Sequence, residues 1–294
     1  MIDFRKLSID DRDEFEPILK SNSSFACDSS FSTMFLWKDA YNLRVFRYDD
    51  FILRAYEKDV KINSYAFPVG NGDKYSVCNK IFNDAKERNV PLTFICIPYE
   101  AKIFLEDNFS GKFEFEEQRN SEDYIYLAEN LINLRGKKYH GKRNHIAKFE
   151  RLYPEYSFDI LTPENMPDAV NVCRKWYELN GQENFETEYH AIESAFEHYN
   201  ELNMFGGILY VNGNAAAMTM GHPINENVFD VNFEKALTEY TGAYTMVNRE
   251  FAKHLCSYKY INREEDLGIE GLRKSKLSYY PEMLFKKYNA RMTG

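Results

Sequence analysis

Period-two alternation of apolar and polar residues predicts a series of strands in the N-terminal half of the chain. These strands are expected at 4–7, 43–48, 51–56, 60–67, 92–97, 113–117 and 123–128. Apolar positions that recur every three or four residues predict two helices after the first strand and one helix on either side of the apolar run 92–97. The N-terminal half is therefore expected to contain both helices and a sheet.

The C-terminal half repeats the same order of elements. Its strands are expected at 156–161, 206–211, 215–221, 228–235, 258–261 and 283–288, with two helices after the first. Asn-Gly-Asn at 212–214 predicts a hairpin turn. A glycine turn and a helix follow the strand 228–235, and a lysine-bearing helix precedes the last strand. The repeat predicts two α/β domains, 1–132 and 133–294, with mixed, mainly antiparallel sheets.

The strand 228–235 carries a row of polar side chains. Every second residue is polar, namely Asp230, Asn232 and Glu234, and these are expected to share one face while apolar residues pack on the other. The row either faces solvent on a sheet edge or lines a cleft, and both interpretations are open. In a cleft, Asp230 or Glu234 could orient an amine or act as a general base.

Residues after this strand offer further candidate contacts to a ligand. Gly242 opens a helix whose first amides could attract an anion, and Tyr244 and Asn248 lie on that helix. The acidic loop 262–266, which ends at Asp266, follows the next strand at the end where α/β proteins place ligands. A plain turn and a solvated loop are the structural alternatives.

The charge of the chain is distributed unevenly. The net charge of −9 argues against general binding of polyanions. However, the segment Arg135–Arg151 contains seven Lys or Arg residues and one Glu, a net charge of +6. If Lys142, Arg143 and their neighbours line a groove, they could bind the acceptor end of a tRNA or another phosphate with salt-dependent affinity. The alternative is a solvated helix face.

The cysteines and histidines show no metal-ligand spacing. The five cysteines are scattered and include no C-x-x-C pair, which is typical of buried free thiols in a reducing compartment. The N-terminus is acidic and lacks the apolar region of a signal peptide, and no run of 18 apolar residues occurs. We therefore expect a cytoplasmic protein without a membrane span or a metal site.

Two stretches carry a resemblance to a known family. They are KRNHIAKFER at 142–151 and NREEDLGIEGLRKSKLSYYP at 262–281. The element order resembles that of GNAT (acetyltransferase-like) domains. Two such domains in tandem, with a basic helix opening the second, resemble the Fem-type aminoacyltransferases and the C-terminal domain of phosphatidylglycerol lysyltransferases. The chain looks most like soluble relatives of the latter group, and the resemblance implies two tandem GNAT-like domains.

The resemblance implies a transferase that moves an aminoacyl group from aminoacyl-tRNA to an amine or hydroxyl acceptor, with no further cofactor. Lys142 and Arg143 would hold donor phosphates, and Asp230 or Glu234 would accept the proton. Lys274 or Lys276 would stabilise the oxyanion of the tetrahedral intermediate. Further binding candidates are Asn232, Tyr244, Asn248 and Asp266. Ordinary surface pairing is the alternative for each charge. The lysyltransferases also carry a large membrane domain that this sequence lacks, so a lipid acceptor is not implied.

The sequence departs from the acetyl-CoA pattern of GNAT enzymes, Q/R-x-x-G-x-G/A at the start of a helix. Residues 239–244 read EYTGAY, and the acidic first position would repel a pyrophosphate. Residues 67–72 keep G-x-G but begin with Phe, which indicates a plain turn. A CoA-dependent N-acetyltransferase is therefore an alternative function, and a catalytically inactive ligand-binding module is another.

Overall fold

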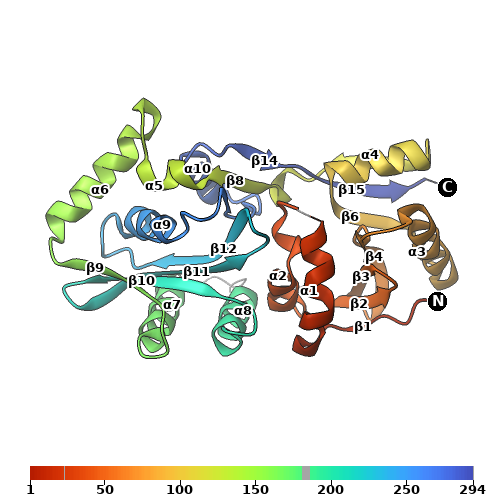
Figure 1. Cartoon of the computed structure of the whole chain (residues 1–294), viewed down its shortest axis with the longest axis horizontal. Helices are drawn as coiled ribbons and strands as arrows, with labels where there is room; N and C mark the ends of the chain where they lie inside the picture. The colour runs from red at the N-terminus through yellow and green to blue at the C-terminus, as the bar shows by residue number, and fades with distance from the viewer. Residues whose placement is uncertain (23, 181–185, 294) are drawn as a thin grey trace. The chain divides into compact units, whose positions relative to one another are not determined.

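A computed structural model describes residues 1–22, 24–180 and 186–293 of the chain (Figure 1). Contacts between residues divide it into two compact units. The first unit comprises Met1–Asp123, Glu265–Glu270 and Leu284–Gly294, and the second comprises Tyr124–Glu264 and Gly271–Met283. These bounds differ from the successive ranges 1–132 and 133–294, because the chain returns to the first unit near its C-terminus.

The first unit is built on a sheet of order β1-β2-β3-β4-β6-β15-β7, with β5 paired to β3. Its strands are β1 (Arg5–Lys6), β2 (Leu43–Tyr48), β3 (Phe51–Lys58), β4 (Lys61–Tyr65), β5 (Val69–Gly70), β6 (Thr93–Pro98), β7 (Phe113–Glu117) and β15 (Lys287–Met292). The C-terminal strand β15 runs antiparallel to both β6 and β7. One strand from the end of the sequence therefore completes the sheet that the N-terminal half begins.

Helices pack on this sheet around an aromatic-rich core that includes Tyr65 and Phe94. The helices are α1 (Arg12–Ser21), α2 (Phe31–Trp37), α3 (Lys74–Arg88) and α4 (Tyr99–Asn108), with short 3-10 turns η1 (Ile9–Asp11), η2 (Cys27–Ser29) and η3 (Arg119–Ser121). The G-x-G segment brings β5 against β3, because a Cβ on Gly70 would lie 2.0 Å from the carbonyl oxygen of Asp50. Gly70 thus has a structural reason to be glycine.

The second unit has a sheet of order β14-β8-β13-β12-β11-β10-β9. Its strands are β8 (Asp123–Leu127), β9 (Tyr156–Ile160), β10 (Phe205–Val211), β11 (Asn214–Pro223), β12 (Val228–Ala236), β13 (Tyr260–Asn262) and β14 (Met283–Phe285). Both sheets are mixed and mainly antiparallel, which confirms the predicted fold class.

Helices cover both faces of the second sheet, with α9 on one side and α7 and α8 on the other (Figure 1). The helices of this unit are α5 (Ala128–Asn133), η4 (Lys137–Tyr139), α6 (His140–Leu152), α7 (Met166–Asn180), α8 (Glu186–Glu197), α9 (Ala243–His254) and α10 (Glu270–Leu277). In the part of the chain that the structure describes, no helix is both long and apolar enough to cross a lipid bilayer.

One expectation about strands is wrong, and one alternative that the sequence left open is excluded. The segment 283–288 is not one strand but contains all of β14 and the start of β15, which pair in different sheets. The polar strand is not at a sheet edge, because β12 lies between β13 and β11 and Asp230 is fully buried. The row of polar residues therefore belongs to the interior of the second unit.

The polar residues of β12 also do not share one face. Phe229 contacts Phe251 of α9, and Glu234 bonds to Asn248 of the same helix. Residues five apart on a regular strand point to opposite faces, so the strand must be irregular between them. A register shift occurs here, because Gly221 pairs with Val231 while the preceding residue pairs with Phe233. This bulge sends Asp230 and Glu234 to opposite faces of the sheet.

Gly221 is required by the close approach of β11 to β12. A Cβ at this position would lie 1.9 Å from the carbonyl oxygen of Asp230. We expect Gly221→Ala to lower the free energy of unfolding by about 1–3 kcal/mol, because the strands must separate. Gly141→Ala is the matched control, since nothing lies within 4 Å of its Cβ on helix α6. The control should be neutral or slightly stabilising in urea denaturation, and equal losses in both variants would contradict this explanation.

Candidate functional site

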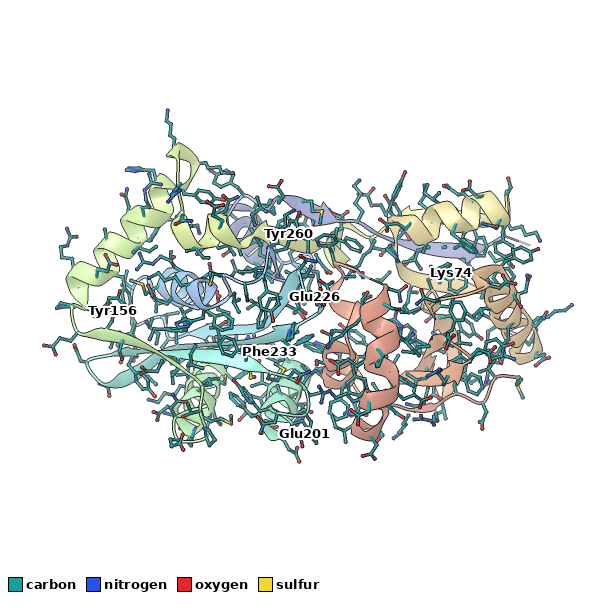
Figure 2. All side chains as sticks on the ribbon, viewed as in Figure 1. Lys74, Tyr156, Glu201, Glu226, Phe233 and Tyr260 are labelled. Carbon is teal, nitrogen blue, oxygen red and sulfur yellow. The ribbon has the colours of Figure 1, made fainter. Side chains whose placement is uncertain are left out.

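Two polar clusters lie in the second unit where β12 and β13 part (Figure 2, in which Phe233 marks β12 and Tyr260 marks β13). The parallel register between the strands ends at Asp230 and Asn262, whereas β12 continues to Ala236. The chain that leaves β13 begins with Arg263 and Glu264. These residues follow the carboxyl end of a parallel strand, which is where open α/β sheets bind ligands.

The first cluster is on the α9 face and is centred on Glu234. Its carboxylate accepts from Arg263 Nη2 at 3.0 Å and from Asn248 Nδ2 at 3.2 Å. The Arg263 side chain is only 10% exposed. Burial alone would lower the pKa of Arg263, but Glu234, Tyr126 and Tyr279 together more than offset this and the pKa is raised. The guanidinium therefore remains charged inside the unit.

Lys142 joins this cluster from helix α6. Its Nζ lies 3.6 Å from the centre of the Tyr279 ring, and Arg263 lies 5.1 Å from the same ring. Burial and the nearby charge of Arg263 lower the pKa of Lys142 to about 8, against the opposing effect of Glu234. We call Glu234, Arg263, Asn248, Lys142 and Tyr279 the Glu234 cluster. It holds two cations and one carboxylate.

Helix α10 and strand β8 fix the backbone around this cluster. Lys276, which is buried, donates from Nζ to the carbonyl oxygen of Arg263 at 2.5 Å. Tyr126 donates its hydroxyl to the carbonyl of Lys276 at 2.8 Å, and Tyr139 donates to that of Tyr279 at 3.1 Å. Lys276 thus positions Arg263 and adds a third positive charge near the end of β13.

The second cluster surrounds Asp230 on the other face of the sheet. Asn232 Nδ2 donates to Asp230 Oδ2 at 3.1 Å and to Glu264 Oε1 at 2.9 Å, and Asn232 Oδ1 lies 2.8 Å from His222 Nδ1. The Asp230, Asn262 and His222 side chains are buried. We call Asp230, Asn232, His222 and Glu264 the Asp230 cluster. It combines two carboxylates with an imidazole, which are groups that can hold or move a proton.

The structure places other predicted site residues elsewhere. Lys274 is exposed on α10, and Tyr244 is partly exposed and bonded through its hydroxyl to Trp176 Nε1 at 2.8 Å. Arg143 donates to the carbonyl oxygens of Leu134 and Gly136, so it caps the turn before α6. Asp266 belongs to the first unit, where it accepts from Arg119 at 3.2 Å and from the amide of Gly268 at 2.8 Å.

Sequence reasoning missed four members of these clusters, Arg263, Tyr279, His222 and Glu264. Position gave a usable signal for two of them, because Arg263 and Glu264 lie in the loop 262–266 that follows the predicted strand 258–261. The contribution of His222 depends on the pairing of β11 with β12, and that of Tyr279 on the packing of α10. Neither relation is visible in a single sequence.

The start of α9 is occupied by protein groups. The amide of Thr241 donates to the hydroxyl of Tyr153 at 3.3 Å. Gly242 has a φ of 91°, and a Cβ there would lie 3.4 Å from the carbonyl oxygen of His145 and from Phe149 Cβ. Helix α6 therefore packs against the turn at which a GNAT enzyme would bind the pyrophosphate of CoA.

A separate group in the first unit resembles a metal site. Cys27, Asp123 and Glu265 place potential ligand atoms within 4.8 Å of one another. However, the buried ammonium of Lys287 bonds Asp123 Oδ1 at 2.7 Å and lies 3.6 Å from Cys27 Sγ. These neighbouring groups outweigh the effect of burial and raise the pKa of Lys287 well above its usual value. A protein cation already lies among these potential ligands, so we assign no metal ion to them.

Comparison with known proteins gives a family and a fold. The family model for "Phosphatidylglycerol lysyltransferase, C-terminal" matches residues 21–291. A crystal structure of a conserved protein of unknown function from Bacteroides thetaiotaomicron is 38% identical, with a TM-score of 0.94 over 100% of both chains. One curated relative, an uncharacterized protein of Mycoplasmoides gallisepticum, is 24% identical over 176 residues, which are 58% of this chain and 56% of that protein.

Two more distant structures share the fold. The C-terminal domain of a protein described as a lysylphosphatidylglycerol synthetase, from Agrobacterium fabrum, has a TM-score of 0.69 at 14% identity, over 98% of this chain and 93% of that one. A tandem GNAT protein from the clavulanic acid biosynthesis pathway has a TM-score of 0.50 at 11% identity, over 100% and 99% of the chains. The predicted tandem GNAT-like architecture is therefore confirmed.

The lowered pKa of Lys142 gives a testable pH dependence of stability. The folded pKa of about 8 lies below the usual 10.5, so the unfolded chain binds more protons between these values. The wild-type protein should therefore gain stability from this group as pH rises from 8 to 10.5. Lys142→Met, which keeps the apolar stem, should be more stable than wild type at pH 7, and this advantage should shrink by pH 10 in urea denaturation.

The matched control is Lys148→Met, an exposed lysine on the same helix. Its stability difference from wild type should stay constant between pH 7 and pH 10. A constant difference for Lys142→Met as well would show that burial and Arg263 do not disfavour the charged form of this lysine.

Proposed function

Since the chain belongs to the family of phosphatidylglycerol lysyltransferase C-terminal domains, we propose that it transfers an aminoacyl group from aminoacyl-tRNA to an amine or hydroxyl acceptor. The family and the fold are those of transferases. The finer assignment is supported by one observation above all. A buried carboxylate, Asp230, lies at the end of the β12–β13 pairing and is held by an amide in a cluster with a second carboxylate and an imidazole.

The proposed reaction needs no activating cofactor. The ester that links the amino acid to the terminal ribose is already reactive, so the enzyme must position donor and acceptor and manage one proton. Asp230 accepts the proton of the acceptor as its nitrogen or oxygen attacks the ester carbonyl. The tetrahedral intermediate then collapses, the ester C–O bond breaks, and the ribose hydroxyl leaves with a proton. The aminoacyl group ends on the acceptor.

Positive charge near the end of β13 supports stabilisation of the intermediate. Lys276 is buried and donates to the backbone carbonyl of Arg263, so its ammonium is held in place before the reaction. Fixed charges in a site with little water stabilise a developing oxyanion more strongly than mobile ones. Lys274 does not fit this role, because it is exposed on the outer side of α10.

The basic segment supports binding of the RNA part of the donor. Within 135–151, the cations Arg135, Lys137, Lys138, Arg143, Lys148 and Arg151 are exposed. The apolar residues Ile146 and Phe149 of α6 are buried, so the helix is anchored while its basic face stays accessible. Contacts of this kind to phosphates give affinity and position but no sequence reading.

The CoA-dependent alternative has less support. A pyrophosphate at the start of α9 would meet the hydroxyl of Tyr153 and the backbone of α6, and Glu239 adds negative charge to the same turn. A ligand that binds only the folded state raises the thermal midpoint. We expect acetyl-CoA at 1 mM, on the order of typical substrate concentrations, to leave the midpoint unchanged. A saturable rise would favour the N-acetyltransferase instead.

Replacement of the proposed base tests the chemistry. Asp230→Asn keeps the size of the side chain at this position of β12 but removes the proton acceptor. We expect transfer from aminoacyl-tRNA to slow by about 10²–10⁴-fold, with unchanged affinity for the RNA. Single-turnover transfer and RNA binding are measured on the same preparation, with Glu226→Gln as a control on the loop before β12. Transfer at the wild-type rate would exclude Asp230 as the base.

The salt dependence of RNA binding tests the donor. Lys148→Ala with Arg151→Ala should weaken tRNA binding uniformly across tRNA species. The slope of log affinity against log salt should fall by roughly 1 for each phosphate group that the variant no longer binds. Lys175→Ala on α7 serves as the control, because this exposed lysine lies outside the basic segment. If wild-type protein has no salt-sensitive affinity for charged tRNA at low ionic strength, the proposed donor is wrong.

A further inference from the structure

We propose that the Glu234 cluster binds one phosphodiester of the donor RNA together with a neighbouring ribose hydroxyl. Arg263 and Lys142 contact the anionic oxygens, and Asn248 Oδ1 accepts the hydroxyl. This inference rests on the proposed function, because it takes the ligand to be part of an RNA donor. It assigns the recognition of a single phosphate to a largely buried cluster and not to the exposed basic segment.

The charge balance of the cluster calls for an anion. Arg263 and Lys142 are two cations, and both share the single carboxylate of Glu234 as their nearby negative charge. Glu234 is already engaged, since one oxygen accepts from Arg263 and the other from Asn248. A second anion beside Lys142 would favour its charged form. The unliganded cluster therefore carries an excess of positive charge that a phosphate would balance.

Two buried atoms of the cluster lack hydrogen-bond partners among the described residues. They are Arg263 Nη1, a donor, and Asn248 Oδ1, an acceptor. Buried polar atoms in folded proteins are nearly always paired, so an unpaired donor and an unpaired acceptor next to one carboxylate need an explanation. Both residues are bonded to Glu234. A ligand that carries an anionic oxygen beside a hydroxyl would satisfy both atoms at once.

The chemistry of the donors favours a phosphate. A guanidinium presents two parallel N–H groups to phosphate oxygens, and only one side of Arg263 is used by Glu234. Lys142 supplies a point charge held against the ring of Tyr279. The same helix that positions Lys142 exposes Lys148 and Arg151. A polyanion that follows α6 would therefore reach the cluster with one of its phosphates, and that phosphate would fix the register of the RNA.

The test follows the titration of Lys142 with and without a small probe. The side-chain NMR signals of labelled lysines are recorded against pH, and the Lys142 signal is assigned by its disappearance in Lys142→Met. The midpoint should be about 8 in free protein. Saturating cytidylyl-(3′→5′)-adenosine, which has one phosphodiester and adjacent ribose hydroxyls, should raise it by about one unit or more. A mixture of adenosine and cytidine, which lacks the phosphate, should leave the Lys142 midpoint unchanged. The Lys175 signal should not move with the dinucleotide or with the mixture.

Substitution of the other contacts separates binding from folding. Arg263→Lys keeps the charge but removes the planar pair of N–H groups, and we expect about a tenfold or greater decrease in affinity for the dinucleotide. Asn248→Ala removes the acceptor of the hydroxyl, together with the amide that donates to Glu234, but leaves both cations in place. It should therefore lower affinity for the dinucleotide but not for inorganic phosphate. The thermal midpoint of each variant shows whether it folds. If one variant fails to fold, the affinity of the other is sufficient for the test.

Three results would overturn the proposal. The first is a Lys142 midpoint that the dinucleotide does not move. The second is an equal shift with glycerol 1-phosphate at the same concentration, which would assign the site to a lipid headgroup or a small phosphate. The third is equal affinity of wild type and Asn248→Ala for the dinucleotide.

The proposed function and the phosphate site can fail separately. A midpoint shifted by the dinucleotide, in a protein that transfers no aminoacyl group, would preserve the phosphate site and remove the proposed function. Aminoacyl transfer at the wild-type rate in Lys142→Met would preserve the proposed function and remove the phosphate site.

Discussion

The buried ion pair between Glu234 and Arg263 constrains the arrangement of the second unit near the site. Each partner is about nine-tenths buried, and an isolated charge at such a position is strongly unfavourable. Removal of one partner of a buried pair costs about 3–5 kcal/mol, because the other charge remains without compensation. The pair therefore requires β12, the chain after β13 and helix α9 to keep their relative positions. Lys276 adds to this constraint by holding the Arg263 carbonyl.

The bulge between β11 and β12 explains why the polar residues form two clusters and not one. A regular strand would send Asp230 and Glu234 to the same face, where two carboxylates would compete for the same cations. The extra residue sends Asp230 toward His222 and leaves Glu234 to pair with Arg263. One strand thereby contributes to the Asp230 cluster on one face and to the Glu234 cluster on the other. Gly221 permits this arrangement because the backbones of the two strands are in contact.

Local pattern was sufficient to predict most of the elements, and the limits of that prediction are physical. Strand 228–235, the hairpin at 212–214 and the helix after Gly242 appear as predicted, because alternation, turn chemistry and periodicity are local properties. The bulge could not be predicted, since it depends on which residues of β11 face β12. The role of Arg143 was also hidden, because its positive charge is visible in the sequence but its two backbone acceptors are a consequence of the turn before α6.

Charge clusters in the two units show why the second unit is the better candidate for chemistry. In the first unit, the ammonium of Lys287 lies among Asp123, Cys27 and Glu265, so the cation of this group is surrounded by carboxylates and its charged form is favoured. In the Glu234 cluster, two cations share one carboxylate, and the pKa of the more exposed one is lowered to about 8. A duplicated fold does not require two working sites, because function depends on particular groups and not on the architecture. The excess of positive charge around Glu234 is a property that an anionic substrate can relieve, whereas carboxylates outnumber the cation in the Lys287 group.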